Sequence, residues 1–289
     1  MSTRIVYLNG EFLPVDQAKI SVMDRGFLFA DSVYEVVPFL DRHLVGLEGH
    51  LNRLRRSLSG ISLPYVFENS FFIDIFKTLL ARNPDQGDNR TVYLQITRGV
   101  SDTRAHFFPS DSITPTIFVQ TTAVDMPSFD VIKQGMVAVT AEDLRWEWCH
   151  IKSTSLLPNV LSTQKAKEAA AKEAILVRDG MITEGASSNV FVVKDGEILT
   201  PRLSIGILGG ITREIVLDLA AQNNIPCRET EISEIALWDA DEVWVTSATK
   251  EILPIVRIND HVVGDGCVGK VWLRMMDLYK AYKNALPLF

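Results

Sequence analysis

The sequence predicts a two-domain protein of the α+β or mixed α/β class. With 289 residues, of which 47% are hydrophobic, the chain can form one large or two medium domains, each with its own core. Stretches with the two-residue period of strands interleave with stretches of helical spacing, without a strict strand–helix–strand rhythm. The pattern breaks at residues 124–131, which we take as a linker between a small N-terminal domain, 1–123, and a larger C-terminal domain, 132–289.

The N-terminal domain is expected to contain two strand pairs, two helices and a further strand pair. RIVYLNGEFLP has apolar-rich arms around Asn9-Gly10, the strongest short-range hairpin signal. SVYEVVPFLDRHLVGL predicts a second pair that turns at Asp41-Arg42. Leucines at helical spacing predict a helix that stops near Gly60. The remaining elements are a helix over 68–83 and strands over 91–99 and 114–123, the strands being joined by the polar loop 101–113.

The C-terminal domain is expected to alternate strands, helices and hairpins. Two strand pairs turn on Asp-Gly, at Asp179-Gly180 and Asp195-Gly196. An Ala- and Lys-rich stretch predicts a helix over 156–174. The other expected elements are strands over 136–144 and 241–249 and helices over 209–224 and 269–285.

Composition narrows the function classes. The net charge of −7 and the pI near 5.3 disfavour nucleic-acid binding, which needs a basic face. Three scattered cysteines, Cys149, Cys227 and Cys267, lack metal-ligand spacing, so we expect no metal site and a reducing compartment. No apolar run is long enough for a membrane span or a signal peptide. We therefore expect a cytoplasmic protein without a membrane partner.

Lys152 stands out in the stretch CHIKSTSLLPNVL, residues 149–161. Apolar neighbours on both sides are compatible with partial burial, which lowers the pKa of a lysine and produces the neutral amine of a nucleophile. They are equally compatible with a lysine at a strand end that extends its ammonium group to water. This stretch alone leaves both interpretations open.

Two further stretches could hold a phosphate group. GILGGITRE, residues 206–214, ends a glycine-rich loop and opens a helix, with Thr212 near the helix N-terminus, where backbone N–H groups attract anions. Its glycine spacing differs from that of the dinucleotide-binding motif. TSATKE, residues 246–251, could supply more donors. An ordinary flexible loop before a helix would explain the first stretch equally well.

Charged residues of two loops are candidates for contacts with a bound molecule. Glu184 in TEGASSN could face a cleft, where a carboxylate keeps a pyridine nitrogen protonated, or it could be an exposed turn residue. Arg104 and His106 lie two positions apart, so an extended loop would direct both to the same side, where they could bind a carboxylate. The alternative is a solvated loop tip.

In their combination and order these stretches resemble the pyridoxal-phosphate aminotransferases of fold type IV. The resemblance runs from LNGEF at residue 8 to VWVTSAT, and its most specific part comprises IKSTSLLPNVL, EAILVRDGMITEGASSNVFVV and GILGGITRE. Within this group the sequence is most similar to the D-amino acid transaminases. The resemblance implies a two-domain fold-type-IV enzyme that transfers an amino group from a D-amino acid, D-alanine above all, to a 2-oxo acid such as 2-oxoglutarate. It also implies a homodimer.

The resemblance assigns roles to individual residues. Lys152 would form the Schiff base with pyridoxal 5'-phosphate and move the substrate proton, and Glu184 would pair with the pyridine nitrogen. The phosphate and the ring would be held by Arg53, Ser188, Leu208, Ile211, Thr212, Ser247, Ala248 and Thr249. The substrate carboxylate would be held by Tyr34, Arg104 and His106.

Two departures from the family pattern bear on substrate choice. The stretch usually written Gly-Asp-Gly reads Ala30-Asp31-Ser32, and the serine run reads Ala186-Ser187-Ser188. The alternatives within the family are a transaminase of branched-chain L-amino acids or (R)-amines and the aminodeoxychorismate lyase. A relative that binds the cofactor or another anion without turnover is a third alternative, from outside enzymology.

Overall fold

The computed structural model describes residues 4–109 and 113–289, which form two compact units. Unit 1 comprises the chain up to Asp125 together with Ile151–Ser155 and Pro287–Phe289. Unit 2 comprises Met126–His150 and Leu156–Leu286. Because both units are discontinuous in sequence, the boundaries 1–123, 124–131 and 132–289 stay a prediction. The short segment that carries Lys152 is part of unit 1.

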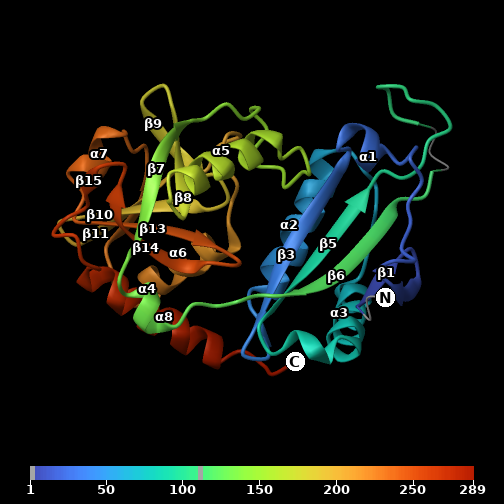
Figure 1. The fold of residues 1–289 in the computed structure, drawn as a ribbon, viewed down its shortest axis with the longest axis horizontal. Coiled ribbons are helices and arrows are strands. Elements are labelled where there is room, and N and C mark those ends of the chain that lie inside the picture. Colours follow the sequence, from blue (N-terminus) through green and yellow to red (C-terminus); the bar gives the residue numbers. More distant parts are fainter. Residues whose placement is uncertain (1–3, 110–112) are drawn as a thin grey trace. The chain divides into compact units, whose positions relative to one another are not determined.

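Unit 1 is built on a six-stranded sheet in the order β2-β1-β6-β5-β3-β4, and all its pairs are antiparallel. Figure 1 shows these strands in blue and green. Both predicted hairpins are confirmed, with turns at Asn9-Gly10 and Asp41-Arg42. The strands are β1 (Ile5–Leu8), β2 (Glu11–Pro14), β3 (Ser32–Leu40), β4 (His43–Leu44), β5 (Arg90–Thr97) and β6 (Thr116–Ala123). Residues 110–112 of the predicted polar loop lie outside the described residues.

Two long helices cover the sheet of unit 1, and both were predicted, the first from its leucine spacing. Helix α2 (Leu47–Gly60) packs on β3, and α3 (Asn69–Arg82) packs on β1 and β6. Their apolar faces and the sheet form one buried core that includes Leu54, Phe76 and Val92. The short α1 (Arg25–Phe29) and a 3-10 turn at Pro84–Gln86 were not expected from the sequence.

Unit 2 is built on a nine-stranded mixed sheet in the order β12-β11-β10-β13-β14-β7-β8-β9, with β15 paired to β14. Three pairs are parallel, β11–β12, β14–β7 and β7–β8, and the remainder are antiparallel. The strands are β7 (Met136–Glu142), β8 (Glu173–Arg178), β9 (Met181–Gly185), β10 (Asn189–Lys194), β11 (Glu197–Pro201), β12 (Cys227–Thr230), β13 (Glu242–Ser247), β14 (Glu251–Ile258) and β15 (His261–Val262). Strands β12, β14 and β15 were not expected from the sequence.

Three longer helices, α5, α6 and α8, flank this sheet. Helix α5 packs on β7 and β8, whereas α6 packs on β13 and α8 (Figure 1). The helices of unit 2 are α4 (Phe129–Ile132), α5 (Leu157–Glu168), α6 (Ile211–Gln222), α7 (Ile235–Trp238) and α8 (Lys270–Asn284). Across the described ranges, 4–109 and 113–289, no helix is both long and apolar enough to cross a membrane.

The helix predicted over 156–174 is wrong at its C-terminal end. It stops at Glu168, and Ala170 adopts a left-handed φ of 54°, which breaks the helical path. Glu173 already belongs to β8, where it pairs in parallel with Ala138 of β7. Tertiary pairing of β8 with β7 therefore overrides the helix propensity of the alanine run.

Candidate functional site

In unit 1 the segment that carries Lys152 lies along the start of β3. The Tyr34 amide donates to the Lys152 carbonyl at 3.0 Å, and the Thr154 amide donates to the Ser32 carbonyl at 3.1 Å. The Lys152 amide in turn donates to the Ser57 hydroxyl of α2 at 3.2 Å. These bonds fix the backbone of Lys152 on both sides.

The Lys152 side chain lies over an aromatic ring. Its Nζ is 4.2 Å from the centroid of Tyr34, and the side chain is half-buried. The Tyr34 ring is itself 5.7 Å from that of Tyr93, centroid to centroid. An ammonium group against a ring face is attracted to the π electrons, which restricts where the amine can go. The structure thus brings together two of the predicted site residues, Lys152 and Tyr34.

Arg53 belongs to a buried ion cluster. Its Nε and a terminal nitrogen donate to the two carboxylate oxygens of Glu35, at 2.8 and 2.6 Å, and His50 contacts the same carboxylate at 2.7 Å. Burial raises the pKa of Glu35, but the charge and hydrogen bonds of Arg53 and His50 outweigh it and lower the pKa to about 2. The two parallel bonds fix the plane of the Arg53 guanidinium.

This cluster predicts loss of stability in acid. The pKa of Glu35 falls from its ordinary 4.5 to about 2 on folding. The contribution of Glu35 to the free energy of unfolding is therefore complete above pH 4.5 and is lost between pH 4.5 and pH 2. The shift is equivalent to roughly 3 kcal/mol. Burial lowers the pKa of His50 below 6.5, so stability also declines as the pH falls below 6.5. Urea unfolding across pH 3–7 measures both effects. Glu35→Gln should flatten the lower part of the profile, and an unchanged acid slope in that variant would refute this origin.

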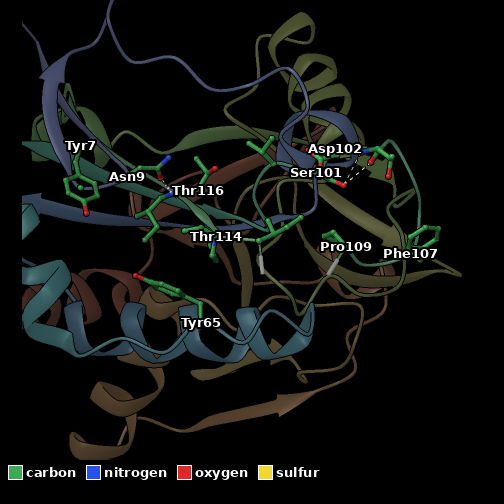
Figure 2. Close-up of a pocket in the computed structure, with 15 residues that line it drawn as sticks. Tyr7, Asn9, Tyr65, Ser101, Asp102, Phe107, Pro109, Thr114 and Thr116 are labelled. Atoms are coloured by element: carbon green, nitrogen blue, oxygen red, sulfur yellow. Dashed lines mark hydrogen bonds between the residues drawn. The ribbon is translucent and has the colours of Figure 1, made fainter. Parts of the chain in front are cut away.

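Arg104 and His106 both contact Phe29 of α1. The guanidinium carbon of Arg104 is 4.8 Å from the ring centroid, and the His106 ring is 5.4 Å away in an edge-on arrangement. The predicted pair therefore shares one aromatic support within unit 1. The same loop borders a pocket of about 940 Å³, on whose wall Figure 2 shows Ser101 and Phe107.

In unit 2 Glu184 lies at the end of β9 and is buried, so the alternative of an exposed turn residue is wrong. Its carboxylate pairs with Arg145 and accepts from the Asn189 side chain and the Leu208 amide, each at 3.2 Å. The cation and the two donors favour a negative charge on this carboxylate, and a negative carboxylate suits a protonated pyridine nitrogen.

Arg145 is a functional candidate that the sequence analysis missed. It donates to both oxygens of Asp143, at 2.8 Å each, and it pairs with Glu184. Burial alone would lower the pKa of Arg145, but the two carboxylates raise it above its ordinary value. Burial likewise would raise the pKa of Asp143, yet Arg145 and Thr183 bring it below its usual range. The only signal was the spacing Asp-x-Arg, which directs alternate residues of an extended segment to one side.

The start of α6 suits an anion. Gly210 is the N-cap, and among the described residues no side chain caps the first turn. A Cβ on Gly210 would come within 2.0 Å of Oδ1 of Asn189, so this close approach requires glycine. Ile211 and Thr212 are buried in the first turn, and Leu208 is half-buried just before it. Amide groups of an uncapped helix start bind phosphate well.

The second predicted phosphate stretch forms the turn between β13 and β14. Ser247 and Ala248 are half-buried and Thr249 is exposed, and the Ser247 hydroxyl accepts from the Lys250 amide at 3.2 Å. Thr246 Oγ1 is buried and finds no hydrogen-bond partner within residues 4–109 and 113–289. A bound anion or a water at this turn would satisfy the hydroxyl.

Ser188 lies beside the buried Glu173. Its hydroxyl donates to Glu173 at 2.6 Å, and Lys250 Nζ donates to the same carboxylate at 2.7 Å. Ser188 therefore supports a buried ion pair. The uncapped α6, the unsatisfied Thr246 and the carboxylate of Glu184 together fit a phosphorylated pyridine.

Comparisons with known proteins agree with this chemistry. A D-alanine aminotransferase from Staphylococcus haemolyticus is 39% identical over 277 residues, which are 96% of this chain and 97% of that relative. A D-alanine aminotransferase from Bacillus licheniformis is 38% identical over 264 residues, which are 91% of this chain and 92% of the relative.

Solved structures share the fold. The T.th. branched-chain amino acid aminotransferase, solved with pyridoxamine 5'-phosphate, matches with a TM-score of 0.88 over 98% of this chain and 95% of that one, at 22% identity. A fold IV-transaminase from Curtobacterium pusillum matches with a TM-score of 0.80 over 96% and 94%, at 26% identity. The predicted fold class is thereby confirmed. The family model described as amino-transferase class IV matches residues 32–258, and with the near full-length relatives it establishes that the chain belongs to this family.

Proposed function

We propose that the protein is a pyridoxal-phosphate-dependent D-amino acid transaminase that uses D-alanine as donor and 2-oxoglutarate as acceptor. The observation that supports this most is the full-length similarity to D-alanine aminotransferases, combined with an Arg104–His106 pair that shares the support of Phe29. A pair of donors suited to a carboxylate favours amino acids over plain amines as substrates.

Within this proposal the protein supplies position and proton transfer. Bound pyridoxal phosphate supplies the electron sink for the charge that develops at the substrate Cα. Lys152 would attach the cofactor through Nζ. Once the substrate has released this amine, it would take the proton from the substrate Cα and deliver it to the cofactor carbon that receives the amino group. Tyr34 holds this amine over its ring face at 4.2 Å, so the amine has a defined place from which to act.

Other residues hold the cofactor in the proposed site. Glu184 would pair with the pyridine nitrogen and keep it protonated, and Leu208 would pack against the ring. The amides of Ile211 and Thr212 bind the phosphate through the uncapped α6 start. The remaining phosphate and support contacts would come from Arg53, Ser188, Ser247, Ala248 and Thr249.

The visible absorption spectrum of the cofactor-loaded protein tests the function directly. D-alanine added without an acceptor should convert the cofactor to its amino form, and L-alanine and L-leucine should not. Conversion by L-leucine or by an (R)-arylamine alone would assign the protein to one of the other transaminases. Pyruvate released from aminodeoxychorismate would indicate the lyase, and a spectrum that never changes with any donor would indicate a binding protein without turnover.

Removing the guanidinium of Arg104 should weaken D-alanine use selectively. We expect Arg104→Leu to lower kcat/KM for D-alanine about 10- to 100-fold, because a charged hydrogen-bond donor to the carboxylate is lost. Steady-state kinetics with D-alanine and with the carboxylate-free (R)-1-phenylethylamine measure the difference. Arg56→Leu, on the exposed side of α2, is the matched control. Unchanged D-alanine kinetics in Arg104→Leu would show that the carboxylate binds elsewhere.

We also propose a cytoplasmic homodimer. Large apolar side chains of unit 1 are exposed beside the Arg104 loop, among them Val22, Phe27, Phe107 and Phe108, and a second copy would cover such a surface. The free cysteines Cys149, Cys227 and Cys267 suit a reducing compartment. Light scattering on a sizing column and cell fractionation test the two statements.

A further inference from the structure

A buried triad of charges lies directly before β3, next to the loop that carries Arg104. The Asp31 carboxylate accepts from Arg25 Nε at 2.8 Å and from Arg98 Nε and a terminal nitrogen at 2.8 and 3.0 Å. The side chains of Arg25, Arg98 and Asp31 are only 4%, 7% and 12% exposed. Water therefore screens these three charges little, and the geometry of the triad is well defined.

Both arginines of the triad extend to the loop. A terminal nitrogen of Arg25 donates to the Ala105 carbonyl at 2.7 Å, and the Arg98 guanidinium stacks on Phe108 at 3.9 Å from the ring centroid. Arg25 also lies over Phe29, 4.8 Å from its centroid, on which Arg104 and His106 rest. The two arginines thus hold the loop on either side of His106.

Among the residues that the structure describes, the loop backbone around Ala105 is bonded mainly to Arg25 and to the loop itself. The Ala105 amide donates to the Thr103 carbonyl within the loop itself, and Phe107 is 75% exposed. The pocket of about 940 Å³ in Figure 2 lies between Ser101 and Phe107 of the loop and Tyr7 and Tyr65 of unit 1. The position of the loop therefore depends on its contacts with Arg25 and Arg98 and on the packing of Arg104 and His106 against Phe29.

The ion pairs of the triad also distinguish Arg104 from Arg25 and Arg98. Asp31 pairs with Arg25 and Arg98, whereas Arg104 forms no ion pair within the described part of the chain. A substrate carboxylate that approaches this region is therefore attracted to Arg104, because the other two guanidiniums already have an anionic partner.

We propose that Asp31 is a positioning residue for the substrate carboxylate: through Arg25 and Arg98 it holds the loop so that Arg104 and His106 stay against Phe29. This inference rests on the proposed function, and it adds a residue that touches no substrate. The left-handed Ala30, with φ of 53°, ends α1 immediately before Asp31. Ala30 accepts this conformation at a position where the family pattern has glycine, so the triad forms despite that departure.

Asp31→Asn tests the proposal because it removes the charge and keeps the shape. We expect the KM for D-alanine to rise about tenfold with kcat changed less than about twofold. Hydrogen exchange of the amides of residues 103–108 should accelerate at least about tenfold, while amides of α2 and β5 keep their rates. Asp31→Glu should recover most of both effects, since it restores the charge.

Asp130→Asn is the matched control, because Asp130 also forms an ion pair, with Lys133, but is 80% exposed and lies in unit 2. It should change neither KM nor loop exchange. If Asp31→Asn lowered kcat and stability but left KM and the hydrogen exchange of the loop unchanged, Asp31 would have only a structural role and the inference would be wrong. If the wild-type enzyme does not convert D-alanine, the proposed function fails, and unchanged exchange of 103–108 in Asp31→Asn would then separately overturn the positioning role.

Discussion

Lys152→Ala should abolish transamination, with a loss of at least about 10³-fold in kcat. The variant lacks the only amine that we place at the substrate Cα, and a positioned general base alone contributes about 10²–10⁴-fold. The fold should survive, because the Lys152 backbone bonds to Tyr34 and Ser57 do not involve its side chain. Single-turnover kinetics with D-alanine measure the loss, and circular dichroism checks the fold.

A covalent readout separates the role of Lys152 from an indirect effect. Borohydride treatment of the cofactor-loaded protein should fix the cofactor mass on the peptide that contains Lys152, and Lys152→Ala should show no such adduct. Lys167→Ala, on the exposed face at the end of α5, should match the wild type in both assays. Retained turnover in Lys152→Ala, or an adduct on another lysine, would remove Lys152 from its proposed role.

Local sequence signals were sufficient for most elements and for several site features. Asn9-Gly10 and Asp179-Gly180 fix hairpins because their turn residues adopt left-handed conformations, which is a property of a few neighbouring residues. The start of α6 at Gly210 was also visible in the sequence, because a glycine-rich stretch directly precedes residues with helical spacing. These features depend only on residues that are close in sequence, so they can be predicted without knowing which distant segments come into contact.

Partners across long stretches of sequence could not be predicted. Arg145 pairs with Glu184 39 positions away, and Asp31 pairs with Arg98 67 positions away. Residue type and spacing do not encode these contacts, because they depend on which strands become neighbours. The same limit explains why the alanine run at 169–171 looked helical: the helix ends before it because β8, which follows, pairs with β7.

Arg145→Met should be the most destabilising single change among the site residues, by about 3–5 kcal/mol, because it leaves buried carboxylates without their main cation. Asp143 is fully buried and Glu184 is 7% exposed at its side chain, so water cannot replace the guanidinium. Repulsion between the two carboxylates should also raise the pKa of one of them, so the variant should recover part of its stability as the pH is lowered. Urea unfolding at pH 7 and pH 5 measures both effects.

Arg178→Met is the control for Arg145→Met, because Arg178 contacts the same Asp143 carboxylate at 3.2 Å but is 29% exposed. Arg145 still donates to both oxygens of Asp143 in this variant, so the carboxylate keeps its main cation and the loss should stay below about 1 kcal/mol. The double variant Arg145→Met/Asp143→Asn should be more stable than Arg145→Met alone, since it removes one of the uncompensated charges. Equal losses in the two single arginine variants would contradict a central role of Arg145. If Arg145→Met bound the cofactor as tightly as the wild type, Glu184 would not need Arg145 to bind it. The Asn189 side chain and the Leu208 amide, which donate to Glu184, would then be sufficient to hold this carboxylate.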